Sequence, residues 1–313
     1  MVKIDLITGF LGSGKTTFLK KYASHLLKQG SRIGILENDF GAVNVDMMLL
    51  LDLEGDNCEL EMISGGCDAD CHKRRFKTKL IAFGMSGLDR VIVEPSGIYD
   101  VEEFFDTLRE EPLSQWYEIG SVIAVVDAKP EKNLTEEAGR ILAAQITAAG
   151  RVVLSRSQYA SSEEISETVQ RLNEILMKYG CRRKRQEQIV CRDWESLTAE
   201  DFDEIADGGY DPDDCMAAPV DKENVFTSLY FMNVCMTEEE IRLAVRKIFE
   251  DPACGQVLRI KGFMPGAEGG WLEINATSGQ TVIGQRQAGQ EILIVIGEAL
   301  NENAIRSYLM KEH

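Results

Sequence analysis

Three glycines, a lysine and two threonines cluster near the start of the chain, in Gly9-Phe10-Leu11-Gly12-Ser13-Gly14-Lys15-Thr16-Thr17. The segment fits the pattern G-x-x-x-x-G-K-[ST], follows a run typical of a strand and precedes a run typical of a helix. Glycines allow successive backbone N–H groups to point inward around a polyphosphate, and the helix N-terminus adds partial positive charge. We therefore predict a nucleoside triphosphate site, with Lys15 on the β- and γ-phosphates and the Thr16 hydroxyl on Mg²⁺. The predicted nucleotide contacts in this loop are Gly9, Gly12, Ser13, Gly14, Lys15, Thr16 and Thr17.

An acidic residue and a glycine stand at the end of a later apolar run, in Glu94-Pro95-Ser96-Gly97. A carboxylate at the end of a buried strand can hold the Mg²⁺ shell or orient water, and the Gly97 N–H can sense a γ-phosphate. The alternative explanation is a plain surface turn. We predict that Lys15, Glu94 and Gly97 are catalytic, that Thr16 and Glu94 hold Mg²⁺, and that Asp39, in an acidic turn, lies beside the phosphates.

Strands that alternate with helices position these residues. Residues 2–8, 32–36, 58–63, 89–93, 121–126, 151–154 and 188–191 are typical of strands, and residues 16–29, 68–85, 101–109, 135–149 and 162–179 of helices. Residues 47–53 fit either a short helix or a strand. The alternation predicts an α/β fold of the P-loop NTPase type, with a mostly parallel sheet flanked by helices. Ligands collect at the carboxyl ends of such strands, so Gly9, Glu37, Gly65, Glu94 and Ser155 are expected along one rim.

The pattern changes after residue 206. Residues 207–223 are rich in glycine, proline and aspartate, which is typical of a linker. Beyond them, residues 225–234, 257–263, 271–276, 281–284 and 291–296 are typical of strands, and residues 237–249 and the end of the chain of helices. We predict a nucleotide domain over residues 1–206 and a smaller α+β domain over residues 224–313, built as a sheet with helices on one face.

The composition narrows the class of protein. The 313 residues, 44% of them apolar and 27% charged, are enough for a main domain and a smaller one. The net charge of -18 argues against a nucleic-acid binder, because a phosphate backbone would be repelled. No stretch reaches the roughly 18 apolar residues of a membrane span, and no signal-peptide pattern opens the chain, so a cytoplasmic protein is expected. The eight cysteines are expected as reduced thiols, metal ligands or catalytic groups rather than disulfides.

The order of these motifs resembles the CobW-like family of P-loop GTPases, relatives of the GTPases that help insert nickel into urease and hydrogenase. The resemblance rests on GFLGSGKTT, ENDFG, SGGC, VIVEPSG and RIKGF, which together span nearly the whole chain. It implies a GTP-dependent metal chaperone, metal inserter or cobalamin-associated factor. It also implies a client metalloprotein or corrinoid-related protein, a C-terminal partner domain and self-association into a homodimer.

The family's C-x-C-C metal motif is altered in this chain, which has Cys67-Asp68-Ala69-Asp70 followed by Cys71 and His72. Only Cys67 carries over directly. Cys67 and Cys71 are four residues apart, so on a helix they share one face. Two thiolates with His72, or with Glu37 and Asp39, would complete a site for Zn²⁺ or a similar metal such as Co²⁺ or Ni²⁺. Two reduced cysteines at a helix start are the alternative.

The family's guanine-reading N-K-x-D is also altered, because Ser155-Arg156-Ser157-Gln158 stands in its place. A carboxylate accepts hydrogen bonds from two guanine N–H groups, whereas neutral Gln158 offers one carbonyl oxygen and an amide donor. Arg156 is predicted to stack over the base in place of the usual lysine stem. Ser155, Arg156 and Gln158 are thus the predicted base contacts, for GTP on family grounds, with ATP as the alternative nucleotide.

Three functions remain open from the sequence. The first is a Mg²⁺-dependent nucleoside triphosphatase whose turns at residues 37–41 and 94–97 close on the γ-phosphate, and whose nucleotide state alters metal affinity or partner docking. The second is a nucleotide-binding regulatory module with slow or lost hydrolysis. The third is a small-molecule kinase, for which the chain shows no arginine-rich lid.

Overall fold

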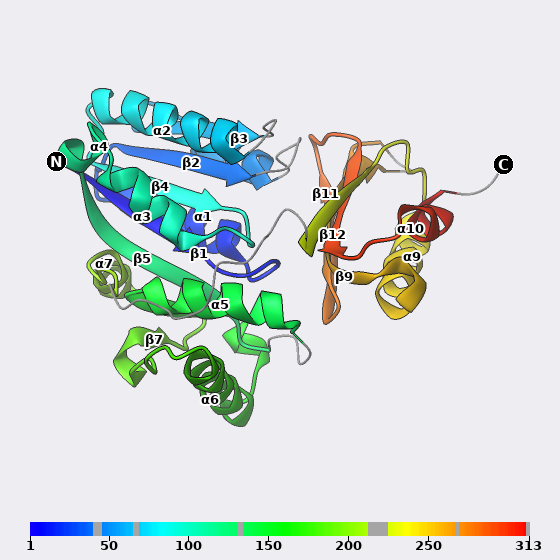
Figure 1. Cartoon of the computed structure of the whole chain (residues 1–313). Coiled ribbons are helices and arrows are strands. Elements are labelled where there is room, and N and C mark those ends of the chain that lie inside the picture. Colours follow the sequence, from blue (N-terminus) through cyan, green and yellow to red (C-terminus); the bar gives the residue numbers. More distant parts are fainter. Residues whose placement is uncertain (40–45, 65–68, 130–133, 212–224, 267–268, 311–313) are drawn as a thin grey trace. The chain divides into compact units, whose positions relative to one another are not determined.

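The computed structural model describes residues 1–39, 46–64, 69–129, 134–211, 225–266 and 269–310 (Figure 1). The chain divides into two compact units, Met1–Val220 and Asp221–His313. The division falls inside the segment predicted to be a linker. Each unit has its own sheet and its own hydrophobic core, so each is a domain in its own right.

The first unit is built on seven strands in the order β3-β2-β4-β1-β5-β6-β7, and every described pairing between neighbours is parallel. The strands are β1 (Val2–Thr8), β2 (Ile33–Asp39), β3 (Cys58–Ser64), β4 (Arg90–Pro95), β5 (Tyr117–Asp127), β6 (Arg151–Ser155) and β7 (Ile189–Val190). Because all run the same way, their carboxyl ends form one rim. The predicted parallel α/β fold is confirmed.

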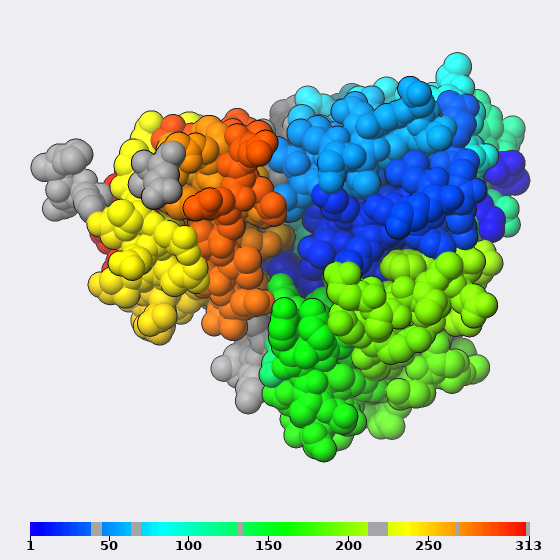
Figure 2. Space-filling model, turned by 180° about the vertical axis from the view of Figure 1, so that it is seen from behind, coloured from blue at the N-terminus to red at the C-terminus, as the bar shows by residue number. Residues whose placement is uncertain are grey.

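Helices cover both faces of this sheet, because successive side chains of the central strands point to opposite faces and are apolar on both. The helices are α1 (Lys15–Lys28), α2 (Ala69–Met85), α3 (Val101–Arg109), α4 (Leu113–Trp116), α5 (Glu136–Ala148), α6 (Ser162–Lys178) and α7 (Ala199–Ala206). Val91 and Val93 join the core under α2, α3, α5 and α6, whereas Ile92 joins the core under α1 and α7. Figure 1 shows α3 and α5 over one face, and Figure 2 shows α7 beside α1.

Four short elements, two α-helices and two 3-10 helices, were not predicted in their observed form. α4 and α7 lie in segments for which no helix was predicted, and both are too short to give a clear apolar period. Residues 47–53, predicted as a helix or a strand, form the 3-10 helices η1 (Asp46–Leu49) and η2 (Leu51–Leu53). Residues 207–211 of the predicted linker pack on the first unit, where Asp211 N donates to Ala148 O at 3.0 Å.

The second unit holds an antiparallel five-stranded sheet in the order β11-β10-β9-β12-β8. Its strands are β8 (Phe226–Phe231), β9 (Gln256–Pro265), β10 (Trp271–Thr277), β11 (Gln280–Arg286) and β12 (Ile292–Glu298). The helices α9 (Glu238–Glu250) and α10 (Glu302–Leu309) pack on one face, over a core that includes Ile260, Ile274 and Val295. This is the predicted α+β domain. Among the described residues, no helix has the length and hydropathy to cross a membrane.

Candidate functional site

The loop between β1 and α1 has a backbone that only glycine adopts easily. The φ angles of Gly9, Gly12 and Gly14 are 142°, 73° and 97°, in the region that disfavours side chains. A Cβ on Gly9 would lie 2.2 Å from Val125 O. Helix α1 starts at Gly14 without a side-chain cap, whereas α6 starts with a complete capping box. The first N–H groups of α1 therefore remain available to an anionic ligand.

Lys15 and Thr16 stand at this helix start and reach in two directions. The Lys15 side chain is buried and its Nζ donates to Gly9 O at 3.1 Å, so the ammonium lies across the loop. The Thr16 hydroxyl donates to Glu94 Oε1 at 2.8 Å. The structure thus brings together Lys15 and Thr16 from the start of α1 and Glu94 from β4, at the rim of the sheet.

Glu94 is a buried carboxyl group beside a second carboxyl group. Burial raises the pKa of Glu94 to about 7. The positive charge of Lys15 lowers this pKa, and the negative charge of Asp46 raises it further. Glu37 of β2 is its neighbour across the parallel pairing and is also buried. Oε2 of Glu94 receives no hydrogen bond from the N–H and O–H donors of the described residues. Two buried carboxyls and a hydroxyl are oxygen ligands of the kind that Mg²⁺ prefers, and the role predicted for Thr16 and Glu94 stays a prediction.

The turn after β4 packs directly on the loop after β1. A Cβ added to Gly97 would lie 2.6 Å from Leu11 N and 2.8 Å from Leu11 Cα. Both are backbone atoms that cannot move aside, so only glycine fits. Ser96 N donates to Asn38 O at 2.9 Å, which ties the turn to the end of β2. Gly97 therefore lies next to the loop that carries Lys15.

The segment after β6 braces the same loop. Arg156 has a positive φ of 55°; its guanidinium pairs with Asp127 and donates to Gly12 O at 3.1 Å. The predicted stacking of Arg156 on a base thus competes with these two contacts. Ser155 is buried beside Gly14. Gln158, in the 3-10 helix η3 (Ser157–Tyr159), is exposed.

Two residues at this rim were missed by the sequence reasoning. Asp127 ends β5, so the rule that placed Glu94 at a strand end would also have found it. The second residue is Trp194, in the 3-10 helix η5 (Trp194–Ser196). Its ring lies 5.3 Å from Phe18 edge to face, and 3.4 Å from a Cβ added to Gly14. No spacing rule connects Trp194 to the loop, because the fold alone brings them together.

The predicted transition-metal ligands are only partly described. Cys67 and the side chain of Asp39 lie outside the described residues. At the start of α2, Cys71 is partly exposed and His72 is fully buried. Within the described ranges no three His, Cys, Asp or Glu side chains are grouped to hold a metal ion. The four-ligand set therefore stays a prediction, since Cys67 belongs to it.

The described cysteines are free thiols, as expected, with one exception. Cys58, Cys71, Cys191, Cys235 and Cys254 are free. Cys181 is in a disulfide, contrary to the expectation of reduced cysteines. Burial raises the pKa of the Cys58 thiol to about 11, with further rises from Glu54 and Glu59, so this cysteine is unsuited to metal binding at neutral pH.

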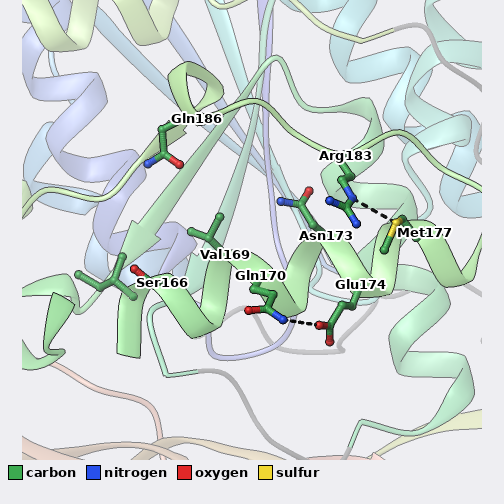
Figure 3. A pocket seen from close by; sticks show the side chains of 9 residues that line it. Ser166, Val169, Gln170, Asn173, Glu174, Met177, Arg183 and Gln186 are labelled. Atoms are coloured by element: carbon green, nitrogen blue, oxygen red, sulfur yellow. Dashed lines mark hydrogen bonds between the residues drawn. The ribbon is translucent and has the colours of Figure 1, made fainter. Parts of the chain in front are cut away.

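A groove of about 470 Å³ lies along α6, away from the residues above. Val169, Asn173 and Met177 line it from the helix, and Arg183 and Gln186 from the segment that follows (Figure 3). The Arg183 side chain lies over Met177, with Nε 3.1 Å from the sulfur. None of the predicted nucleotide or metal residues lines this groove.

Comparison with known proteins identifies relatives of the first unit. Residues 3–180 match the family described as CobW/HypB/UreG, nucleotide-binding domain. The zinc chaperone YjiA of Escherichia coli is 30% identical over 186 residues, which are 55% of this chain and 55% of that protein. The zinc-regulated GTPase metalloprotein activator 1 of Schizosaccharomyces pombe is 25% identical over 187 residues, 58% of this chain and 44% of that protein.

The chain spans about half the length of the curated relatives it matches. Among solved structures, the Zn(II)-bound YjiA GTPase from E. coli aligns over 99% of both chains with 21% identity and a TM-score of 0.38.

Proposed function

The chain belongs to the CobW/HypB/UreG nucleotide-binding family, and on this premise we propose that it is a Mg²⁺-dependent GTPase that carries zinc to a client protein. The observation that supports this most is the contact between Thr16 and Glu94 beside the buried Lys15. It joins a phosphate-binding loop to a strand-end carboxylate in the arrangement that Mg²⁺–triphosphate requires. The cytoplasmic location remains a prediction.

The residues of the chain have separate roles in this proposal. Lys15 exchanges its bond to Gly9 O for the oxygens of the β- and γ-phosphates, and the N–H groups at the start of α1 hold the remaining phosphate oxygens. Thr16 and Glu94 would hold Mg²⁺, which when bound neutralises charge that develops on the phosphates. Gly97 offers its N–H to the γ-phosphate and is kept in place by the backbone of Leu11.

Guanine is the proposed base because the family resemblance is to GTPases and one curated relative carries GTPase in its name. The segment from Ser155 to Gln158 lacks the carboxylate that reads guanine, and Gln158 is exposed. Arg156 is held by Asp127 and Gly12 O, so it braces the loop whichever base is bound. ATP use is the alternative, and a direct comparison of the two nucleotides decides it.

Zinc is assigned as cargo because the relatives are named zinc chaperones. The candidate ligands are Cys67, Cys71, His72 and Glu37. Glu37 and Glu94 are cross-strand neighbours at one rim, so a metal held by Glu37 would lie next to the nucleotide. Metal and nucleotide would then alter each other's affinity by the same factor. Cobalt or nickel as cargo, a corrinoid-related client and a homodimer remain predictions.

Phosphate release by the full chain tests the enzyme. We expect Mg²⁺-dependent release from GTP, its loss with EDTA, and a fall of at least about a hundredfold for Lys15→Ala. Lys28→Ala is the matched control, because Lys28 is an exposed lysine at the other end of α1. Tight GTP binding with no phosphate release above that of Lys15→Ala would favour the regulatory module. Faster phosphate release from ATP than from GTP would contradict guanine as the preferred base.

A zinc titration against a chelating dye tests the cargo site. We expect Cys71→Ala and His72→Ala each to weaken Zn²⁺ binding by about tenfold or more, because each removes a ligand. Cys235→Ala is the control, since Cys235 is an exposed free cysteine of the second unit. Unchanged Zn²⁺ affinity in both variants would exclude this site.

A further inference from the structure

Gln145 is a polar side chain in the core of the first unit. It belongs to α5, is 0% exposed, and lies among residues of an otherwise apolar cluster such as Leu142 and Ile146. Its Nε2 donates to Gly97 O at 3.1 Å and to Tyr99 O at 3.4 Å. The NH₂ group of Gln145 therefore donates to two carbonyl oxygens of the turn that follows β4.

These contacts fix which way the amide faces. Both turn atoms are carbonyl oxygens, so only the NH₂ end of Gln145 can face them. The other end, Oε1, is buried and has no hydrogen-bond partner in the described part of the chain. A buried acceptor without a donor is unfavourable, so a side chain chosen only for packing would be apolar here.

The turn is held on both sides of the Gly97 N–H. On one side, Ser96 N donates to Asn38 O at 2.9 Å. On the other side, the Gly97 carbonyl accepts from Gln145. Gly97 itself lies against Leu11 of the phosphate loop, with room for no side chain. The direction of the Gly97 N–H is thus set by β2, by the loop and by Gln145.

We propose that Gln145 is a positioning residue that aims the Gly97 N–H at the γ-phosphate, and so makes the protein distinguish a nucleoside triphosphate from a diphosphate. The inference rests on the proposed function, because it takes Gly97 as the group that senses the γ-phosphate. A diphosphate has no atom at that place, so its binding does not depend on Gln145.

The test is the affinity of the full chain for GDP and for a non-hydrolysable GTP analogue, with Mg²⁺, in Gln145→Met and Gln145→Glu. Methionine keeps the volume and removes the donor, and glutamate sets a carboxylate against two carbonyl oxygens. We expect the affinity for the GTP analogue to fall about tenfold or more in Gln145→Met, and at least as far in Gln145→Glu. GDP affinity should stay within about twofold, and GTP turnover should fall with GTP affinity.

Thr147→Val is the matched control. Thr147 is a second buried polar residue of α5, and its hydroxyl donates to Ala143 O of the same helix at 2.8 Å rather than to the turn after β4. It should leave the preference for GTP over GDP unchanged. Equal losses of GTP and GDP affinity in Gln145→Met would reduce Gln145 to a structural residue and overturn the proposal, as would no loss of either.

Two further observations separate the possible failures. If wild-type protein showed no Mg²⁺-dependent GTP hydrolysis, the proposed function would fail; active wild type with an unchanged Gln145→Met overturns only the role of Gln145. If the variants do not fold, hydrogen exchange of wild-type protein takes their place. Amides of residues 97–101 should exchange at different rates with GDP and with the GTP analogue, and equal rates would overturn the proposal.

Discussion

Replacement of Glu94 by glutamine should stabilise the ligand-free protein at alkaline pH. Burial raises the pKa of Glu94 to about 7 from an ordinary value of 4.5, so the folded protein binds this proton more tightly than the unfolded chain does. The stability from the neutral carboxyl is complete below about pH 4.5 and is lost as the pH rises to about 7. Glutamine is neutral at every pH and its carbonyl oxygen can still accept from Thr16.

The size of the effect follows from the two pKa values. A difference of this size between folded and unfolded states corresponds to about 3 kcal/mol when the carboxyl is fully ionised, and to about 2 kcal/mol lost between pH 5.5 and pH 8. Wild-type protein should therefore lose about 2 kcal/mol more of its free energy of unfolding over this interval than Glu94→Gln. Titrating groups that do not interact with Glu94 cancel in the difference between the two proteins.

Urea unfolding of the first unit, with EDTA and without nucleotide, measures this difference at pH 5.5, 6.5, 7.5 and 8. Residual Mg²⁺ would stabilise the ionised carboxylate and hide the effect, so chelation is essential. Parallel pH profiles for wild type and Glu94→Gln would show that Glu94 titrates at an ordinary pKa. That result would contradict the burial of the Glu94 carboxyl group beside a second carboxyl group.

Other changes test the remaining contacts. Gly97→Ala puts a Cβ 2.6 Å from Leu11 N, so GTP turnover should fall at least about tenfold, as phosphate release would show, with GDP affinity largely kept. Arg156→Ala removes the donor to Gly12 O and unpairs Asp127, and calorimetry should give a nucleotide Kd about tenfold higher. Lys184→Met leaves the carbonyls of Thr147 and Ala149 without this donor, so the free energy of unfolding should fall by about 1–3 kcal/mol in a denaturant titration. Normal turnover in Gly97→Ala, normal affinity in Arg156→Ala, or normal stability in Lys184→Met would each contradict the contact concerned.

The sequence was sufficient for the fold because its long elements have strong periods. Apolar residues on both faces of β4 predicted a buried parallel strand, and the helix predicted over residues 16–29 matches α1 to within one residue at each end. Helix α7 was not predicted, because its eight residues are too few to show a reliable period of apolar residues. Its Phe202 and Ile205 nevertheless complete the core under α1. Short elements are decided by tertiary packing rather than by local pattern.

The site was predictable where chemistry follows the chain closely. The spacing from Gly9 to Thr16 and the strand end at Glu94 carried their own signal, and the fold places these residues side by side. Contacts between segments that are distant in the sequence carried no such signal. Nothing in the spacing of Trp194 or Gln145 tells that each lies against a nucleotide loop or turn, because those contacts depend on how the helices pack. The altered base-reading motif placed Arg156 at the nucleotide, but it gave no sign of the contacts with Asp127 and Gly12.

The most direct test of the account is the Zn²⁺ affinity of the full chain in its two nucleotide states. A competition titration with a chelating dye, carried out with Mg²⁺ and either GDP or a non-hydrolysable GTP analogue, measures both values. If the rim around Glu37 and Glu94 couples cargo to nucleotide, the two affinities should differ by at least about tenfold, and Lys15→Ala should abolish the difference. Equal Zn²⁺ affinities in the GDP and GTP states would contradict a nucleotide-driven zinc chaperone.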